Sequence, residues 1–246
     1  MNIVIPIAGL GQRFVDEGYS VFKPLISVQG SSMILKAIES LGVQGNYIFI
    51  LRKQDNLEEL TTVLHQYAKK EGRDIIKTIK IIEIDYLTDG PASTVLLSKD
   101  FINTDEPLLV ANCDQIMRWD GLLFKTFCEN SKLQGIVVTY YSNSAKNSYA
   151  LIDEKGLVTK IKEKEVISAI SLNGIHYWSK GSLFVESAEA MIISDDRATN
   201  GEFYIGPSYN NMIASGQKVG IYHIPNECHH AVGTPDDLRE YLRNVD

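Results

Sequence analysis

The chain has few cysteines and no long apolar run. Only three of its 246 residues are cysteine, Cys113, Cys128 and Cys228, and none stands in CxxC spacing with another. Such a sparse, odd set favours a reducing compartment, so we expect a cytoplasmic protein. The apolar runs fall far short of the about 20 residues that a membrane-spanning helix needs, and the N-terminal residues lack the pattern of a signal peptide. We therefore expect no membrane association.

The chain also lacks an excess of basic charge. It has 24 Lys and Arg residues against 31 Asp and Glu residues, a formal net charge of −7 at pH 7. This balance argues against nucleic acid as a partner, because nucleic-acid binding needs a basic face. Anionic small molecules remain candidate ligands, but they require a locally basic pocket or a metal ion. The positions of particular Arg and Lys residues therefore matter more than the total charge.

Apolar segments alternate with amphipathic segments in the first part of the chain. The pattern predicts buried strands at residues 2–7, 47–51, 79–84, 108–111 and 135–141, and helices at residues 33–41, 55–70, 91–99 and 121–131. Strands and helices that alternate in this way favour an α/β fold, with a Rossmann-like, mostly parallel sheet and helices on both faces. In such sheets ligands bind beyond the carboxyl ends of the strands.

From about residue 149 the pattern changes to short alternating strands. They are expected at residues 149–153, 158–162 and 170–178, followed by a helix at 181–193, a polar loop at 194–201, a helix at 208–215, a strand at 219–224 and a helix at 234–243. The three strands indicate a smaller, partly antiparallel lobe. The sequence shows no linker and no internal repeat, so we expect one domain over residues 1–246 with two lobes.

A glycine-rich loop follows the first predicted strand. It reads Ala8-Gly9-Leu10-Gly11-Gln12-Arg13, and Lys23-Pro24-Leu25 follows ten residues after Arg13. Glycines allow backbone N–H groups to approach phosphate oxygens, and the side chains of Arg13 and Lys23 suit phosphate. For the glycines alone, a tight turn with two solvated basic residues is the more common explanation. The dinucleotide-binding and P-loop spacings both fail here, because Phe14 replaces a required glycine and no Gly-Lys-Ser/Thr follows.

An acidic residue stands at the end of the strand predicted at 108–111. The segment continues Asn112-Cys113-Asp114, and a carboxylate that leaves a buried strand is costly unless it has a partner. Mg²⁺ prefers hard oxygen ligands and binds through one or two carboxylates together with substrate phosphates. Asp114 is therefore a candidate metal ligand, with a helix cap as the alternative.

These motifs, taken together, resemble the sugar-phosphate nucleotidyltransferases, which carry G-x-G-x-R and then K-P near the N-terminus. The resemblance implies a three-layer, glycosyltransferase-A-like fold in which residues 1–145 bind the NTP and residues 146–246 bind the acceptor. It also implies roles for particular residues. The loop Ala8, Gly9, Leu10 and Gly11 would wrap the NTP phosphates, Arg13 would contact them, and Lys23 would assist transfer at the α-phosphorus. Gly90 and Ala92 would pack on the nucleobase, Asn112 would bind nucleotide, and Asp114 would hold the catalytic Mg²⁺.

Further matches lie in the second half. Glu163-Lys164 resembles a family segment in which the Glu binds a sugar hydroxyl and the Lys binds the substrate phosphate. Asn173 and Gly174 match a strand against which substrate lies, and Glu202 belongs to a segment that closes the pocket.

One match is incomplete. Many relatives have a second metal-binding Asp where this chain has Ala231. Either one metal site is enough, or His229, His230 or Asp236 compensates. Zinc binding by Cys228, His229 and His230 is disfavoured, because consecutive residues share a tetrahedral site poorly.

The resemblance implies an enzyme that transfers NMP from an NTP to a sugar 1-phosphate or similar phosphate monoester and releases pyrophosphate, for cell-surface polysaccharide precursors. Two alternatives stay open: a cytidylyltransferase for a phosphocholine- or phosphopolyol-like acceptor, and a catalytically weak nucleotide-binding or regulatory protein. The sequence is compatible with a homo-oligomer and does not identify the NTP or the acceptor.

Overall fold

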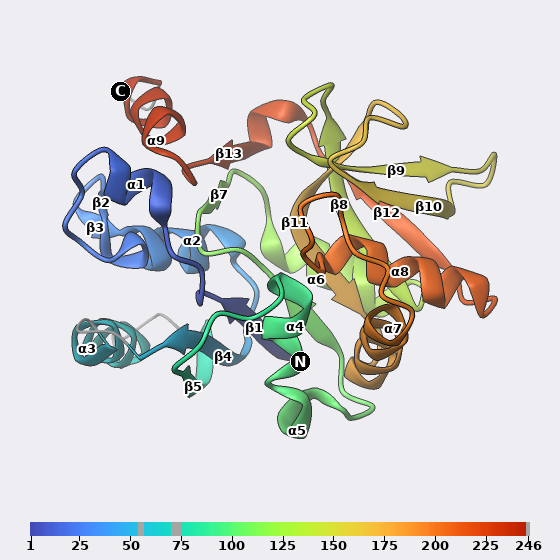
Figure 1. Ribbon diagram of the computed structural model, residues 1–246, viewed down its shortest axis with the longest axis horizontal. Coiled ribbons are helices and arrows are strands. Elements are labelled where there is room, and N and C mark those ends of the chain that lie inside the picture. Colours follow the sequence, from blue (N-terminus) through green and yellow to red (C-terminus); the bar gives the residue numbers. More distant parts are fainter. Residues whose placement is uncertain (54–56, 70–74, 245–246) are drawn as a thin grey trace.

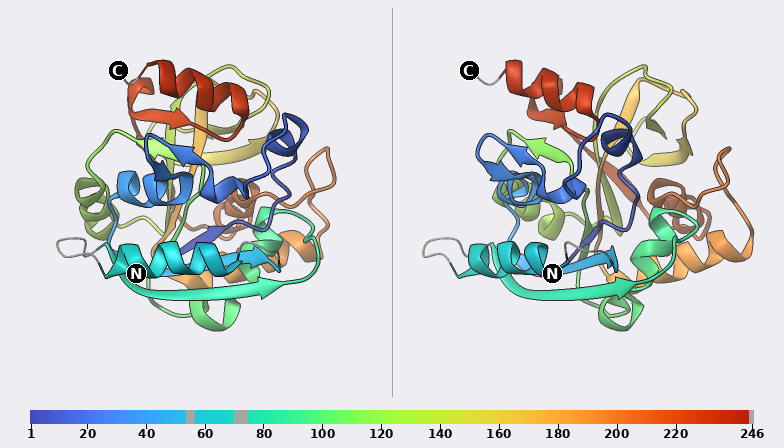
Figure 2. Two further views of the ribbon diagram at one scale, coloured as in Figure 1. Left: turned by 90° about the vertical axis from the view of Figure 1, so that its left-hand side faces the viewer. Right: turned by 60° about the vertical axis from the view of Figure 1, so that its left-hand side comes forward.

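A twisted sheet with helices on both faces forms the centre of the computed structural model (Figures 1 and 2), which describes residues 1–53, 57–69 and 75–244. Within those residues the sheet has nine strands, in the order β10-β9-β11-β6-β1-β4-β5, with β8 paired to β11 and β12. The predicted three-layer α/β fold is confirmed. Among the helices of the described ranges, none has the length and apolar character needed to cross a membrane.

The N-terminal half supplies the parallel part of this sheet. Its strands are β1 (Asn2–Pro6), β4 (Gly45–Arg52), β5 (Ile76–Ile84) and β6 (Leu108–Val110), all parallel to their neighbours within this set. Successive side chains of β1 enter opposite layers: Ile3 and Ile5 pack in one hydrophobic cluster and Val4 in the other. This burial on both faces explains why these strands are continuous apolar runs.

Helices form the outer layers. Those of the first half are α2 (Met33–Leu41), α3 (Leu57–Ala68), α4 (Pro91–Leu96), α5 (Lys99–Ile102) and α6 (Gly121–Asn130). Helix α2 ends at Gly42, whose φ of 63° is readily adopted by glycine, as the sequence predicts. The outer ends of the helix predicted at 55–70 lie outside the described residues, and the described part is helical from Leu57 to Ala68.

The C-terminal half extends the same sheet. Strand β11 (Ile170–Trp178) pairs antiparallel with both β6 and β8 (Gly135–Tyr141), and β9 (Ser148–Ile152) pairs antiparallel with β10 (Val158–Glu163). Strand β12 (Val219–His223) runs parallel to β8. The predicted antiparallel lobe is therefore present, but it continues the main sheet through β11. Helices α7 (Gly181–Ile193) and α8 (Ile205–Ala214) cover it.

Several elements differ from the sequence prediction. The helix predicted at 91–99 is interrupted after Leu96, where the Ser98 hydroxyl donates to the carbonyl of Val95 at 2.6 Å and competes with the backbone pattern. Helix α8 begins at Ile205 rather than at 208, because Pro207 is tolerated in a first turn.

The sequence analysis also missed short elements. They are α1 (Gln12–Asp16), the 3₁₀ turns η1 (Lys23–Leu25) and η2 (Asn226–Cys228), and the strand pairs β2 (Ser27–Val28) with β3 (Ser31–Ser32) and β7 (Gln115–Met117) with β13 (His229–Ala231). The last helix, α9 (Pro235–Arg243), lies within the range predicted at 234–243, and Thr234 caps its first turn. It lies beside α1 (Figures 1 and 2), where Arg239 donates to Glu17 at 2.6 Å. The first and last helices thus lie side by side near the glycine loop.

Candidate functional site

The glycine loop and the segment Asn112–Asp114 lie side by side. Strands β1 and β6 are parallel neighbours, so the segments that leave their carboxyl ends emerge at the same edge of the sheet. Between them is a cavity of about 210 Å³, which we call the loop cavity. Its lining includes Gly9, Gly11, Lys23, Asn112 and Asp114. The structure therefore brings together five of the residues that the sequence singled out.

Backbone geometry leaves this loop open. Gly11 has a φ of +62°, and a Cβ there would lie 3.3 Å from Cβ of Lys23. A Cβ added at Gly9 would meet no other atom within 4 Å, so the backbone there faces open space. Ala8 is buried, whereas Leu10 and Arg13 are exposed. The loop can thus present N–H groups to a ligand, and Arg13 extends from the helix that follows it.

Lys23 and Asp114 form an ion pair in the loop cavity. The Lys23 Nζ lies 2.5 Å from Asp114 Oδ2, with side chains only 20% and 22% exposed. Burial lowers the pKa of Lys23, but the charge and hydrogen bond of Asp114 outweigh it, and the pKa is raised above its ordinary value. The ammonium therefore stays charged. Burial raises the pKa of the adjacent Cys113 thiol to about 12, so that thiol stays neutral.

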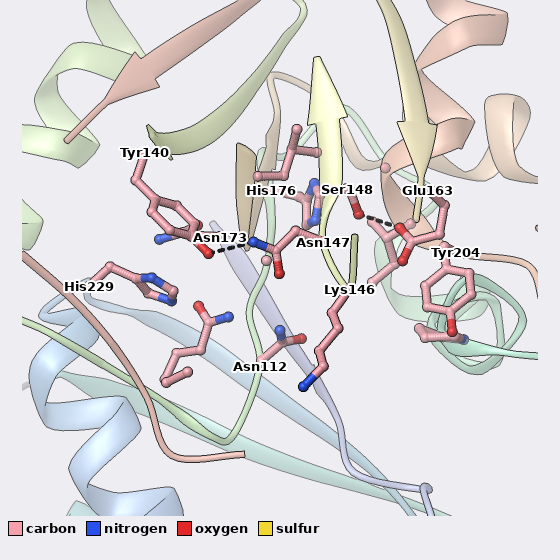
Figure 3. Close-up of a pocket in the computed structure, with 17 residues that line it drawn as sticks. Asn112, Tyr140, Lys146, Asn147, Ser148, Glu163, Asn173, His176, Tyr204 and His229 are labelled. Carbon is pink, nitrogen blue, oxygen red and sulfur yellow. Dashed lines mark hydrogen bonds between the residues drawn. The ribbon is translucent and has the colours of Figure 1, made fainter. Parts of the chain in front are cut away.

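A second pocket of about 280 Å³, which we call the lobe pocket, opens beside the loop cavity (Figure 3). Its walls come from β8, the segment leading into β9, and β10, β11, β13 and α8. Asn112 lines both pockets, so they adjoin at this residue. The sequence analysis missed Tyr140, Lys146 and Ser148 among its lining, because such residues are common in any polar loop or strand.

Glu163 lies in the lobe pocket, as predicted. The Ser148 hydroxyl donates to its carboxylate (Figure 3). Burial raises the pKa of Glu163, and the hydrogen bond from Ser148 and the charge of Lys164 offset this only in part. The carboxylate is thus an oriented acceptor in a partly desolvated place, which suits a hydroxyl group of a ligand.

Lys164 lies at the rim of this pocket and is not part of its lining. Its backbone has a φ of +55°, and its Nζ donates to the Tyr204 hydroxyl at 2.6 Å and lies 4.7 Å from that ring's centroid. The Tyr204 hydroxyl in turn donates to Glu202 at 2.5 Å. Lys164 and Glu202 therefore hold Tyr204, which does line the pocket.

Asn173 and Gly174 lie at an irregularity of β11. The register between β11 and β8 shifts between Leu172 and His176, and Gly174 has a φ of +93°. A Cβ at Gly174 would approach Nδ2 of Asn112 to 2.3 Å. Asn173 is buried, and its Oδ1 accepts from the N–H of Ile175 at 3.0 Å. Both line the lobe pocket, and Gly174 leaves room for the Asn112 side chain between the two pockets.

Gly90 and Ala92 line neither pocket. Gly90 has a φ of +124°, and a Cβ there would lie 2.7 Å from the backbone of Phe203. Ala92 is fully buried, and its N–H donates to the carbonyl of Phe203 at 3.0 Å. The small size of Gly90 and Ala92 allows the close approach of the Phe203 backbone. A contact of these two residues with a nucleobase stays a prediction.

The position of the missing second Asp is next to Asp114. Ala231 on β13 pairs with Gln115 on β7, and the N–H of Val232 donates to the Asp114 carbonyl at 2.9 Å. A Cβ at Gly233 would lie 2.7 Å from Asp114 Oδ2. The chain thus passes close to Asp114 without providing a carboxylate there.

The three proposed substitutes for that Asp do not form a metal cluster. Burial lowers the pKa of His229 to about 4, so it is neutral near pH 7, and it lines the lobe pocket. The ring of His230 packs against Tyr241, and Asp236 binds Arg239 at 2.6 Å. Among the described residues no group of three or more His, Cys, Asp or Glu side chains could hold a metal.

Asp114 can still take part in binding Mg²⁺. Oδ2 pairs with Lys23, whereas Oδ1 has no hydrogen bond to any described residue. One carboxylate oxygen facing a cavity suits a hard cation whose other ligands are phosphate oxygens and water. The residues present therefore fit a metal ion that arrives with a phosphorylated ligand.

Comparison with known proteins identifies the family. The sequence profile described as "Nucleotidyl transferase" matches residues 3–245. The chain belongs to the nucleotidyl transferase family. The prediction of an enzyme of the nucleotidyltransferase class is thereby confirmed.

Relatives of this nucleotidyl transferase include the mannose-1-phosphate guanylyltransferase catalytic subunit beta of Dictyostelium discoideum, 26% identical over 166 residues. That match covers 67% of this chain and 45% of the relative's length, so the chain matches less than half of that relative. The fold is similar to the nucleoside-diphosphate-sugar pyrophosphorylase of Vibrio cholerae RC9, with a TM-score of 0.84, 22% identity and coverage of 98% of this chain and 100% of that one. It also resembles the inositol-1-phosphate CTP transferase of T. maritima, with a TM-score of 0.73, 13% identity and coverage of 99% and 96%.

Proposed function

We propose that this nucleotidyl transferase moves an NMP group from an NTP to a sugar 1-phosphate and releases pyrophosphate. The observation that carries the proposal is the junction of two pockets at Asn112, with the Lys23–Asp114 pair at the wall of one of them. The glycine loop would hold the NTP phosphates, and the lobe pocket would hold the acceptor. We accordingly propose that residues 1–145 bind mainly the NTP and residues 146–246 mainly the acceptor.

The lining of the lobe pocket favours a neutral, polyhydroxylated acceptor body. Apart from Glu163 and Lys146, its polar side chains are amides, hydroxyls and the neutral imidazoles of His176 and His229. Such groups donate to and accept from hydroxyls. A quaternary ammonium group prefers the exposed faces of several aromatic rings, and Lys164 already lies over the ring of Tyr204. A sugar phosphate therefore fits better than a phosphocholine-like acceptor.

The names of relatives agree with this choice. They include enzymes named for mannose 1-phosphate and for nucleoside-diphosphate sugars, and one named for inositol 1-phosphate, which is a phosphopolyol. The phosphopolyol alternative is thus the second candidate. A cyclic polyol has the same hydroxyl chemistry as a sugar, so only the acceptor assay separates the two.

Catalysis would consist of positioning and charge neutralisation. An oxygen of the acceptor phosphate attacks the α-phosphorus, a new P–O bond forms, and the bond to the pyrophosphate leaving group breaks. The nucleophile is already ionised, so no general base is needed. Lys23 and Arg13 would stabilise the charge that develops on the phosphoryl oxygens. Mg²⁺ held by Asp114 and the phosphates would neutralise further negative charge.

Three broader assignments belong to the same proposal. Cys113, Cys128 and Cys228 are all free, which agrees with a reducing, cytoplasmic compartment. We place the reaction in the supply of activated sugars for polysaccharides. We expect neither nucleic acid nor membrane as a partner, and a homo-oligomer is compatible with this assignment.

The decisive test is a matrix of NTPs against sugar 1-phosphates, inositol phosphate and phosphocholine, read by pyrophosphate release. We expect release only when a matching NTP and sugar 1-phosphate are combined. Release with inositol phosphate alone would establish the second candidate. Nucleotide binding without release in any combination would contradict catalysis and favour a regulatory protein.

Glu163→Gln is expected to lower kcat/KM for hydroxyl-bearing acceptors by about tenfold or more, because a hydrogen bond to a charged group is lost. An acceptor that lacks the contacted hydroxyl should be affected much less. Steady-state kinetics with the hydroxyl-bearing and deoxy acceptors measures the difference. Glu165→Gln, at an exposed neighbouring position, serves as the control. Equal losses for both acceptors would refute the role.

Lys164→Ala is expected to raise the acceptor KM by about tenfold or more and to leave the NTP KM nearly unchanged, because the charged hydrogen bond that holds Tyr204 in the acceptor pocket is removed. Arg13→Ala should do the reverse. Initial rates with each substrate varied in turn measure both constants, and the exposed Lys160→Ala is the matched control. Equal effects of Lys164→Ala on both substrates, or no effect at all, would contradict this assignment.

A further inference from the structure

Lys146 is a cation that neither the motifs nor the ion pairs of the structure account for. It lines the lobe pocket, and its side chain extends toward Asn112 (Figure 3). Among the described residues it forms no ion pair, and its side chain makes no hydrogen bond. An ammonium group over a pocket with no acidic partner can accept an anionic ligand without first breaking a contact.

The backbone that carries Lys146 is held in place. Residues 142–147 connect β8 to β9, and the Asn147 amide donates to the Tyr140 hydroxyl at 2.9 Å and to the Ser142 hydroxyl at 3.0 Å. The Tyr149 hydroxyl donates to the carbonyl of Ser144 at 2.8 Å. These contacts on both sides of Lys146 fix the backbone of the connection, so the exposed Lys146 side chain starts from a defined position at the edge of the pocket.

The other lysine near the pocket is less suited to the same task. The Lys164 ammonium donates to the Tyr204 hydroxyl. Its positive charge lowers the pKa of Glu163, whereas the negative charge of Glu202 raises it, so both carboxylates lie close to this site. Two carboxylates near Lys164 disfavour a further anion at that place. Lys146 forms no ion pair within the part of the chain that the structure describes, and it lies on the side of the pocket where Asn112 joins it to the loop cavity (Figure 3).

Under the proposed function, the acceptor phosphate would lie at this junction. Its oxygen must reach the α-phosphorus of an NTP in the loop cavity, whereas the body of the acceptor lies deeper among Glu163 and Ser148. We propose that Lys146 binds the phosphate group of the acceptor at the Asn112 junction and orients it toward the loop cavity. This proposal rests on the proposed function, and it names the phosphate-monoester contact of the same site.

The test compares Lys146→Ala and Lys146→Arg with Lys155→Ala, which removes the same charge from an exposed turn between β9 and β10. In the assay, Lys146→Ala should raise the acceptor KM about tenfold or more, leave the NTP KM unchanged and keep the wild-type melting temperature. Lys146→Arg should restore most of the affinity, because it keeps the charge. Lys155→Ala should match the wild type.

A second measurement does not depend on turnover. Inorganic phosphate is titrated calorimetrically into each protein in an Arg13→Ala background, which weakens binding at the glycine loop. Weaker phosphate binding by Lys146→Ala than by Lys155→Ala supports the role of Lys146. If this difference is seen while no substrate pair reacts, the proposed function fails and the phosphate contact of Lys146 stands. The role of Lys146 would be overturned by equal phosphate dissociation constants for the two variants, or by no phosphate binding to the parent protein. Equal acceptor KM values for Lys146→Ala and Lys155→Ala would overturn it as well.

Discussion

Lys23→Ala is expected to lower kcat by about 10²-fold or more, comparable to removing one preorganised electrostatic group from an active site. The ammonium of Lys23 is partly buried, charged and 2.5 Å from Asp114 at the wall of the loop cavity. A cation in that place stabilises the transition state more than the ground state, because charge develops on the phosphoryl oxygens during transfer. Its loss should therefore act mainly on turnover.

The effect on folding should be small and can be controlled. The aliphatic part of Lys23 packs near Gly11, so Lys23→Met keeps that contact while removing the charge. Single-turnover kinetics should show the same loss of rate for both variants. Thermal unfolding should give both variants melting temperatures near that of the wild type. Lys77→Ala, at an exposed position of β5, is the control for a simple change of charge. Near-normal turnover of the Ala and Met variants would disprove the assignment of Lys23.

Removal of divalent cations with EDTA is expected to abolish activity, and Asp114→Asn should raise the Mg²⁺ concentration needed for half-maximal rate. Asp114 provides one carboxylate, and no second acid lies at Ala231, so binding of the ion depends strongly on this one group. Mg²⁺ titrations of the initial rate measure the change. Full activity without metal would refute the requirement.

Asp236→Asn is the matched control, because Asp236 was a candidate substitute for the missing Asp and instead binds Arg239. It should leave the Mg²⁺ dependence unchanged.

Asp114→Asn should have one further effect. Burial lowers the pKa of Lys23 and Asp114 raises it, so without the carboxylate charge this pKa must fall. The loss of rate at high pH should then begin at a lower pH than in the wild type.

Much of the fold could be predicted because it depends on local patterns. The apolar runs of β1 and β4 and the helical periodicity of α2 and α6 reflect burial within one element, which a sequence records directly. The helix predicted at 91–99 was interrupted because a single serine hydroxyl, at Ser98, competes for a backbone carbonyl. Short pairs such as β7 with β13 were missed because each strand is stabilised by a partner far away in the chain.

The sequence alone determined the chemistry that is available. The glycine loop and the segment that carries Asp114 stand directly after predicted strands. Because the carboxyl ends of neighbouring parallel strands meet at one edge of the sheet, the proximity of these two segments follows from local pattern and topology. Only the tertiary structure decided how the charges in the second pocket are arranged. A positive φ and a contact with Tyr204 turn Lys164 to the rim, whereas a hydrogen-bonded connection leaves Lys146 over the pocket without a partner. The direction of a side chain depends on backbone torsions and on contacts between segments that are distant in the chain. The type and spacing of neighbouring residues specify neither the torsions nor these contacts.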